Sequence, residues 1–171
     1  MATFVLVPGY WLGAWAWHDV AEALRAKGHA VYPMTLTGLA DREHVGGPQV
    51  NLDTHIADVV NLLRYEDLRD VMLVGHSYAA NVITGAADQT PEQIARLIYV
   101  DTWPLPPGVA MSDMMPEAAK QAQERVVAER GDGLVEGPRA ADVNDDVHAA
   151  PPGEGARRLP PLRIGAVVQG V

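Results

Sequence analysis

One serine in the sequence lies in a pattern that suits a nucleophile. Residues 74–80, VGHSYAA, follow a short apolar run and open a small, apolar helical pattern. In a sharp strand-to-helix turn of the Gly-x-Ser-x-small type, the flanking residues must be small because strand and helix approach closely there. Gly75 meets this demand, and Ala79 adds a single methyl group where glycine is usual. The pattern therefore predicts Ser77 as a nucleophile, with free backbone N–H groups at the following helix N-terminus for a developing anion.

The segments around this turn alternate between strand-like and helix-like patterns. Four short apolar runs rich in branched residues are predicted as buried strands: 3–7, 30–35, 70–74 and 95–100. Helical periodicity predicts helices over residues 19–27, 53–64 and 79–87, and Thr90-Pro91-Glu92 is typical of an N-cap followed by proline at the first helical position. The first helix is expected to bury Val20, Ala23 and Leu24, and the second to bury Ile56, Val59, Val60 and Leu63.

This alternation predicts an α/β fold with a mostly parallel sheet and helices on both faces. In such sheets the reactive site lies beyond the carboxyl ends of the strands, near a reversal of strand order. Two loops are expected there: residues 8–17 after the first strand and residues 75–80 after the third.

Composition narrows the class of protein. The chain has 171 residues, of which 48% are hydrophobic and 20% charged, as expected for one globular domain. A net charge of −9 without a basic stripe argues against nucleic-acid binding. The N-terminus has no basic region before its apolar run, and no apolar run approaches the ~18 residues of a membrane span. With no cysteine and no such signals, we expect a cytoplasmic protein that does not bind membranes.

The chain changes character after Trp103. Residues 1–108 are predicted as the core and residues 109–137 as a lid-like segment with a helix over 116–130. Residues 138–171 form an atypical tail rich in Ala, Pro, Gly and Arg, in which only 164–168 could make another strand.

Five stretches together resemble a known family. They are VPGYWLGAWAW, LTGLADREH, NLDTHIADVVNLL, VMLVGHSYAANVI and IARLIYVDTWPLPPG, which follow one another between residues 3 and 108. They are similar to the α/β-hydrolase fold, in the branch of small esterases related to plant methyl-ester esterases and hydroxynitrile lyases. The resemblance implies a serine carboxylic ester hydrolase that acts on a small-molecule ester through an acyl-enzyme on Ser77 and needs no cofactor.

The resemblance also implies where an oxyanion would be held. Two backbone N–H groups are expected to bind it, one from Tyr78 and one from Tyr10 in the loop after the first strand. The family often has His-Gly in that loop, whereas this chain has Pro8-Gly9. The lyase branch uses a hydroxyl side chain where Gly9 stands, so a lyase activity is disfavoured. Trp11, Tyr78 and Trp103, with His76 beside the serine, are candidates for lining the substrate pocket.

The remaining members of a catalytic triad are harder to place. In this family the acid and the histidine follow the serine in the chain, and we expect both to be absent from a chain that is truncated at its C-terminus. Asp101 could supply an acid, although the family position is structural. His148 is expected in a solvent-exposed loop, and His76 adjoins Ser77 but points away from it. His18, His29, His44 and His55 are expected in solvent or structural roles, and no histidine pair has the spacing of a metal site.

Two functional alternatives therefore stay open beside the esterase: an inactive, truncated homologue or binding module, and a hydroxynitrile-lyase-like enzyme. The composition of the tail is also what a frameshift in a GC-rich gene would produce. A parallel sheet that ends at a fourth strand leaves an open edge, so homo-oligomer formation through that edge is expected.

Overall fold

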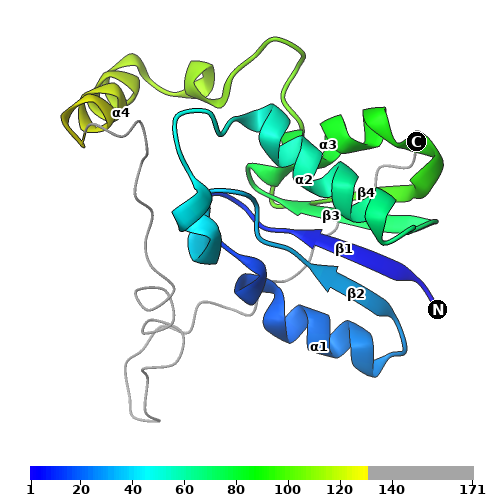
Figure 1. The fold of residues 1–171 in the computed structure, drawn as a ribbon. Helices are drawn as coiled ribbons and strands as arrows, with labels where there is room; N and C mark the ends of the chain where they lie inside the picture. Colours follow the sequence, from blue (N-terminus) through cyan, green and yellow to red (C-terminus); the bar gives the residue numbers. More distant parts are fainter. Residues whose placement is uncertain (131–171) are drawn as a thin grey trace, which may run out of the picture.

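The computed structural model describes residues 1–130, which build a single parallel sheet covered by helices on both faces (Figure 1). The strands are β1 (Thr3–Val7), β2 (Ala30–Pro33), β3 (Val71–His76) and β4 (Ile94–Val100). They lie in the order β2-β1-β3-β4, and each neighbouring pair is parallel. The predicted fold class is therefore confirmed.

Four α-helices accompany these strands: α1 (His18–Ala26), α2 (Leu52–Tyr65), α3 (Ala79–Gln89) and α4 (Glu117–Arg130). Short 3-10 turns lie at Ala14–Trp17, Ala40–Val45, Pro91–Gln93 and Met111–Met114. The turn at Pro91–Gln93 has Thr90 as its N-cap and proline at its start, as the sequence predicts. Among residues 1–130, no helix is both long and apolar enough to cross a membrane.

The two faces of the sheet carry separate apolar clusters because side chains alternate along each strand. On one face, Val5 and Val7 of β1 pack with α2 and α3. On the other face, Leu6 packs with Trp17 and Ala21 around α1. Figure 1 shows α1 on the side of the sheet opposite to α2 and α3.

Helix α2 begins where its sequence provides a cap. The Asn51 side chain accepts a hydrogen bond from the Thr54 backbone N–H at 3.1 Å, and the Thr54 hydroxyl accepts one from the Asn51 N–H at 3.3 Å. This reciprocal pair satisfies N–H groups that have no partner within the helix. Beyond the cap, the four apolar residues predicted for its inner face are all buried.

The strand order places the functional loops side by side. The chain moves from β1 to β2 on one side and then crosses to β3 on the other, so the order reverses between β1 and β3. The register pairs Val7, the last residue of β1, with Gly75 of β3. The loops that follow these two strands therefore leave the same edge of the sheet next to each other, as a site at a reversal of strand order requires.

Several expectations need correction. The inner face of α1 contains Ala21 rather than Ala23, because Trp17 extends the buried stripe from the preceding turn. β2 ends at Pro33, and the Thr35 carbonyl beyond it accepts from Arg42 in the following loop. The Thr35 side chain accepts from the Ala14 N–H and donates to Asp41.

Strand β4 is not buried on both faces as predicted, and Ala95 and Arg96 are exposed. In the part of the sheet that the structure describes, β4 is an edge strand that pairs with β3 alone. The predicted helix over 116–130 corresponds to α4. The tail at 138–171, its strand at 164–168 and the boundary at 137 lie outside the described residues.

The central position of β3 generates a stability prediction. Leu73 is fully buried between the sheet and the α2–α3 layer, so Leu73→Ala should lower the free energy of unfolding by about 2–5 kcal/mol in a urea titration. The same change at Leu52, which is 40% exposed, should cost no more than about 0.5 kcal/mol. Equal losses at the two sites would contradict the described core.

Candidate active site

Ser77 occupies a strained turn between β3 and α3. Its φ angle of 53° lies in the left-handed region that non-glycine residues rarely adopt. Its N–H donates to the Val100 carbonyl at 3.3 Å, and its carbonyl accepts from the Ala80 N–H at 3.0 Å. These bonds hold the residue between the end of β4 and the first turn of α3, which helps to maintain a conformation that costs about 1–3 kcal/mol.

The small residues around Ser77 allow this turn to close. A Cβ atom added at Gly75 would lie 2.9 Å from the Ala79 carbonyl oxygen and 2.9 Å from Ile83 Cδ1. Ala79 is itself fully buried, so its methyl group fits in the space that remains. Gly75 is thus required by the close approach of strand and helix, as the sequence pattern indicates.

The loop after β1 lies directly against this turn. A Cβ atom at Gly9 would lie 3.0 Å from Ser77 Cβ and 3.0 Å from His76 Nδ1. The next residue, Tyr10, packs its ring 4.2 Å from the ring of Tyr78, centroid to centroid. Tyr10 and Tyr78, the two residues expected to donate backbone N–H groups to an oxyanion, therefore come from adjacent segments; that role stays a prediction.

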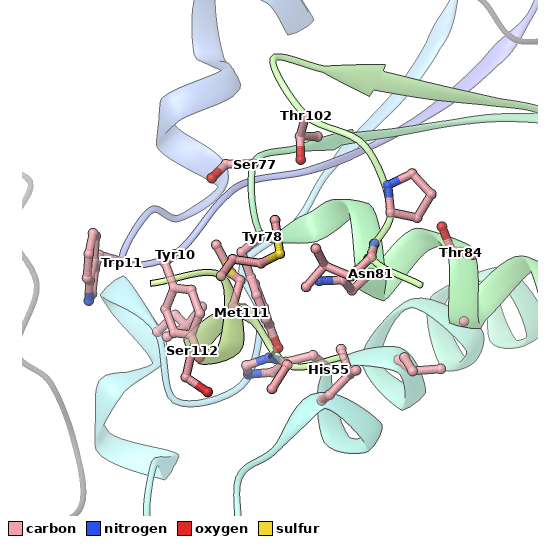
Figure 2. A pocket seen from close by; sticks show the side chains of 18 of the residues that line it. Tyr10, Trp11, His55, Ser77, Tyr78, Asn81, Thr84, Thr102, Met111 and Ser112 are labelled. Atoms are coloured by element: carbon pink, nitrogen blue, oxygen red, sulfur yellow. Dashed lines mark hydrogen bonds between the residues drawn. The ribbon is translucent and has the colours of Figure 1, made fainter. Parts of the chain in front are cut away.

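A cavity of about 1470 Å³ opens beside Ser77. Figure 2 shows Ser77, Tyr10, Trp11 and Tyr78 among the residues that line it. Trp103 contributes to the wall as well, from the segment after β4. Aromatic side chains, prolines and methionines make much of this wall apolar, and Trp103 is 71% exposed at its rim.

His76 requires a correction, because it does not line the cavity that the described residues form. It is the last residue of β3, half-buried beside Gly9. Burial lowers the pKa of His76 below its ordinary value, and the charge of Asp101 opposes that shift. Asp101 follows β4 with a φ of 51° and lines the cavity, so a carboxylate lies near the site without a hydrogen bond to Ser77 among the described residues.

His55 is a part of the site that sequence reasoning assigned only a solvent or structural role. It is 4% exposed, its Nδ1 lies 2.8 Å from the Tyr78 hydroxyl, and its Nε2 lies 2.8 Å from the Thr37 carbonyl oxygen. Burial, and then the neighbouring Tyr10, raise the pKa of the Tyr78 hydroxyl, so it stays protonated at neutral pH. The signal for burial was available, because His55 lies on the same helical stripe as Val59, but nothing in the sequence names its partners.

The other histidines lie away from the serine. His18 pairs with Glu22 at 3.2 Å on the surface, His29 Nδ1 accepts from the Ala2 N–H, and His44 is exposed. Within residues 1–130, no histidine hydrogen-bonds to Ser77 and no group of three potential ligands could hold a metal ion. His148 lies outside the described residues.

The sequence is similar to those of known esterases. The chain is 46% identical over 118 residues to a carbendazim hydrolyzing esterase from Nocardioides sp. (strain SG-4G), covering 69% of this chain and 49% of that protein. It is 31% identical over 110 residues to methylesterase 8 of Arabidopsis thaliana, covering 58% of this chain and 37% of the relative. The chain thus spans half or less of the length of these curated relatives.

Solved structures show the same architecture. An extracellular alpha/beta-hydrolase from a Paenibacillus species, described as sharing structural and functional homology with tobacco salicylic acid binding protein 2, matches with a TM-score of 0.73 and 28% identity. That match covers 81% of this chain and 56% of the other. A methylesterase from Arabidopsis matches with a TM-score of 0.52 and 28% identity, covering 64% of this chain and 47% of the other.

A family model supplies the broadest match. The model described as the alpha/beta hydrolase family aligns with residues 4–168, nearly the whole chain. With the parallel sheet, the reversal of strand order and the strained serine turn already described, this match leads to one conclusion: the chain belongs to the alpha/beta hydrolase family.

Proposed function

We propose that this chain carries the nucleophile and the oxyanion site of a serine carboxylic ester hydrolase that acts on a small-molecule ester. The observation that carries the proposal is Ser77 itself, held at a φ of 53° at the carboxyl end of a central strand and facing a cavity of about 1470 Å³. A serine on an ordinary turn would not need the strained backbone or the close contact at Gly75. Similarity to the esterases from Nocardioides and Arabidopsis supports the choice of an ester substrate.

The proposed mechanism is acyl transfer through Ser77. The Ser77 oxygen attacks the ester carbonyl carbon while a general base takes the serine proton. Charge then collects on the carbonyl oxygen, where the N–H groups of Tyr78 and Tyr10 would bind it; losing one such donor typically costs about 2.7–4 kcal/mol of transition-state stabilisation. The alcohol leaves with a proton returned by the base, and water then hydrolyses the acyl-enzyme.

None of the histidines within residues 1–130 hydrogen-bonds to Ser77, so none of them is assigned as the general base. The five histidines within that range have the partners or positions given above, and the sixth histidine of the chain is His148. The nucleophile is therefore assigned to Ser77, and no base is assigned among residues 1–130.

The nucleophile can be tested by covalent labelling. A fluorophosphonate should label the 171-residue chain, and Ser77→Ala should abolish both labelling and the hydrolysis of a chromogenic short-chain ester. Ser77→Ala removes the oxygen that forms the acyl-enzyme, so turnover by the variant should fall to the background rate of the assay. Mass spectrometry of the labelled peptide identifies the modified residue.

The chain offers a matched control, because Ser112 is its other serine. Ser112 lies in an unstrained 3-10 turn, so Ser112→Ala should still be labelled. Labelling that survives Ser77→Ala would contradict the proposal. A chain that binds aromatic esters, as seen by quenching of tryptophan fluorescence, but is never labelled would instead be a binding module.

The pKa of His76 gives a pH prediction. Since burial lowers this pKa below the ordinary value of 6.5, the unfolded chain binds more protons at this residue as the pH falls through that value. The His76 contribution to stability is therefore present above pH 6.5 and is lost on acidification. His76→Gln should show a smaller drop in the free energy of unfolding between about pH 7.5 and about pH 5.5, measured by urea titration. An unchanged drop would place His76 in solvent.

A further inference from the structure

The buried ring of His55 connects α2 to the serine turn. Its two nitrogen atoms have different partners, the Thr37 carbonyl oxygen and the Tyr78 hydroxyl, each at 2.8 Å. Tyr78 directly follows Ser77 and is the N-cap of α3. Figure 2 shows the Tyr78 side chain extending from the turn toward the His55 ring.

These partners define the direction of both hydrogen bonds. A carbonyl oxygen can only accept, so His55 Nε2 carries the hydrogen and donates it to Thr37. In the neutral imidazole, Nδ1 is then an acceptor, and the Tyr78 hydroxyl donates to it. Every polar atom of the pair is satisfied, as groups this deeply buried require.

At the other end of this connection, Thr37 is bound to α2 by several hydrogen bonds. Asp58, one turn after His55 on α2, accepts from the Thr37 N–H at 2.7 Å and from the Thr37 hydroxyl at 2.8 Å. Thr37 is thereby bound to α2 through its N–H, its hydroxyl and its carbonyl. His55 is held in one orientation by this arrangement, because rotation of its ring would break the bond to Thr37.

The Tyr78 end of this connection adjoins the proposed nucleophile. Ser77 has a strained φ, and such residues persist only where the surroundings hold them. The backbone on one side of Ser77 is held by β3, and the backbone on the other side belongs to Tyr78, whose side chain is 8% exposed and ends on His55. An anchor at the hydroxyl therefore restrains the residue whose N–H is the proposed oxyanion donor.

From this geometry we infer that His55 is a positioning residue, which acts through the Tyr78 hydroxyl to hold the serine turn and its oxyanion N–H in their reactive arrangement. The inference rests on the proposed function, because it assigns His55 a part in the same acyl transfer. His55 does not touch Ser77; its effect is carried by one hydrogen bond and by the rigid phenol ring.

Three variants of the 171-residue chain test this link. Tyr78→Phe keeps the ring and removes the hydroxyl, and His55→Leu removes the acceptor while keeping a side chain of similar size. Each should lower kcat for the chromogenic ester by about tenfold with little change in KM, since the lost interaction acts on the transition state. The double variant should be no slower than either single variant, because all three lack the same bond.

Stability measured on the same proteins separates positioning from folding. His55→Leu leaves the Tyr78 hydroxyl buried without its acceptor, whereas the double variant removes both groups and should regain part of the lost urea midpoint. If His55 only stabilised the fold, kcat would recover with the midpoint. We expect kcat to stay low. His55→Asn, which restores an oxygen acceptor near the Nδ1 position, should recover more kcat than His55→Leu.

Tyr99→Phe is the matched control. The Tyr99 hydroxyl lies 2.8 Å from the Thr84 hydroxyl, so this variant also removes one tyrosine hydrogen bond to α3, but at Thr84 in the middle of the helix rather than at Tyr78. It should shift the urea midpoint as Tyr78→Phe does and leave kcat unchanged. A loss of kcat equal to that of Tyr78→Phe would overturn the inference.

Nitrogen NMR of the histidine side chains provides a readout that does not depend on turnover. His55 should appear as the Nε2–H tautomer, and Tyr78→Phe, but not Tyr99→Phe, should shift its Nδ1 resonance. If the unmodified chain is active and Tyr78→Phe keeps its full kcat, the inference is overturned while the proposed function stands. An unmodified chain that neither turns over the ester nor reacts with the fluorophosphonate would overturn the proposed function and the inference together, even with the NMR shift present.

Discussion

The close approach of β3 and α3 is the constraint on which the rest of the site depends. Only a residue without a side chain fits at Gly75, where any Cβ would press on the Ala79 carbonyl and on Ile83. Because strand and helix lie so close, the chain has to change direction within a few residues, and this tight turn puts Ser77 in the left-handed region. The serine is therefore exposed to the cavity because of how tightly the helix packs on the strand, and the strain is offset by the buried contacts of both elements.

A second set of interactions fixes what surrounds this turn. Thr35 and Thr37 lie in the loop after β2, and their side chains and backbone are bound by Asp41, Arg42, Asp58 and His55. Such a network is stabilising only when its members are satisfied together, because an unpaired polar group in this environment is costly. The loop that lines one side of the cavity is thus tied to α2, and α2 is tied through His55 and Tyr78 to the serine turn. One hydrogen-bonded network therefore joins the cavity wall to the serine turn.

The elements near the serine were predictable because their signals are local. β1 was predicted at its observed bounds, and the other strands and helices within one or two residues, since short branched runs and apolar periodicity depend on neighbouring residues alone. The failures occurred where a residue outside the predicted element decides. Ala21 replaced Ala23 because Trp17 extends the buried stripe, and β2 stopped before Thr35, whose backbone carbonyl accepts from Arg42. His76 was expected at the pocket but lies against Gly9, since consecutive residues of a strand face opposite sides.

By itself, the sequence determined the alternation of strands and helices, the turn that presents Ser77 and the small residues at Gly75 and Ala79, because each depends on chemistry within a few positions. Only the tertiary structure decided that the loop at Gly9 closes on the serine and that Tyr78 meets His55. Those contacts join residues 23 or more positions apart, and they arise from the reversal of strand order, which brings the ends of β1 and β3 together and lays α2 beside α3. Local patterns carry no information about which distant side chain will share a hydrogen bond, so the partners of His55 became visible only in the folded chain.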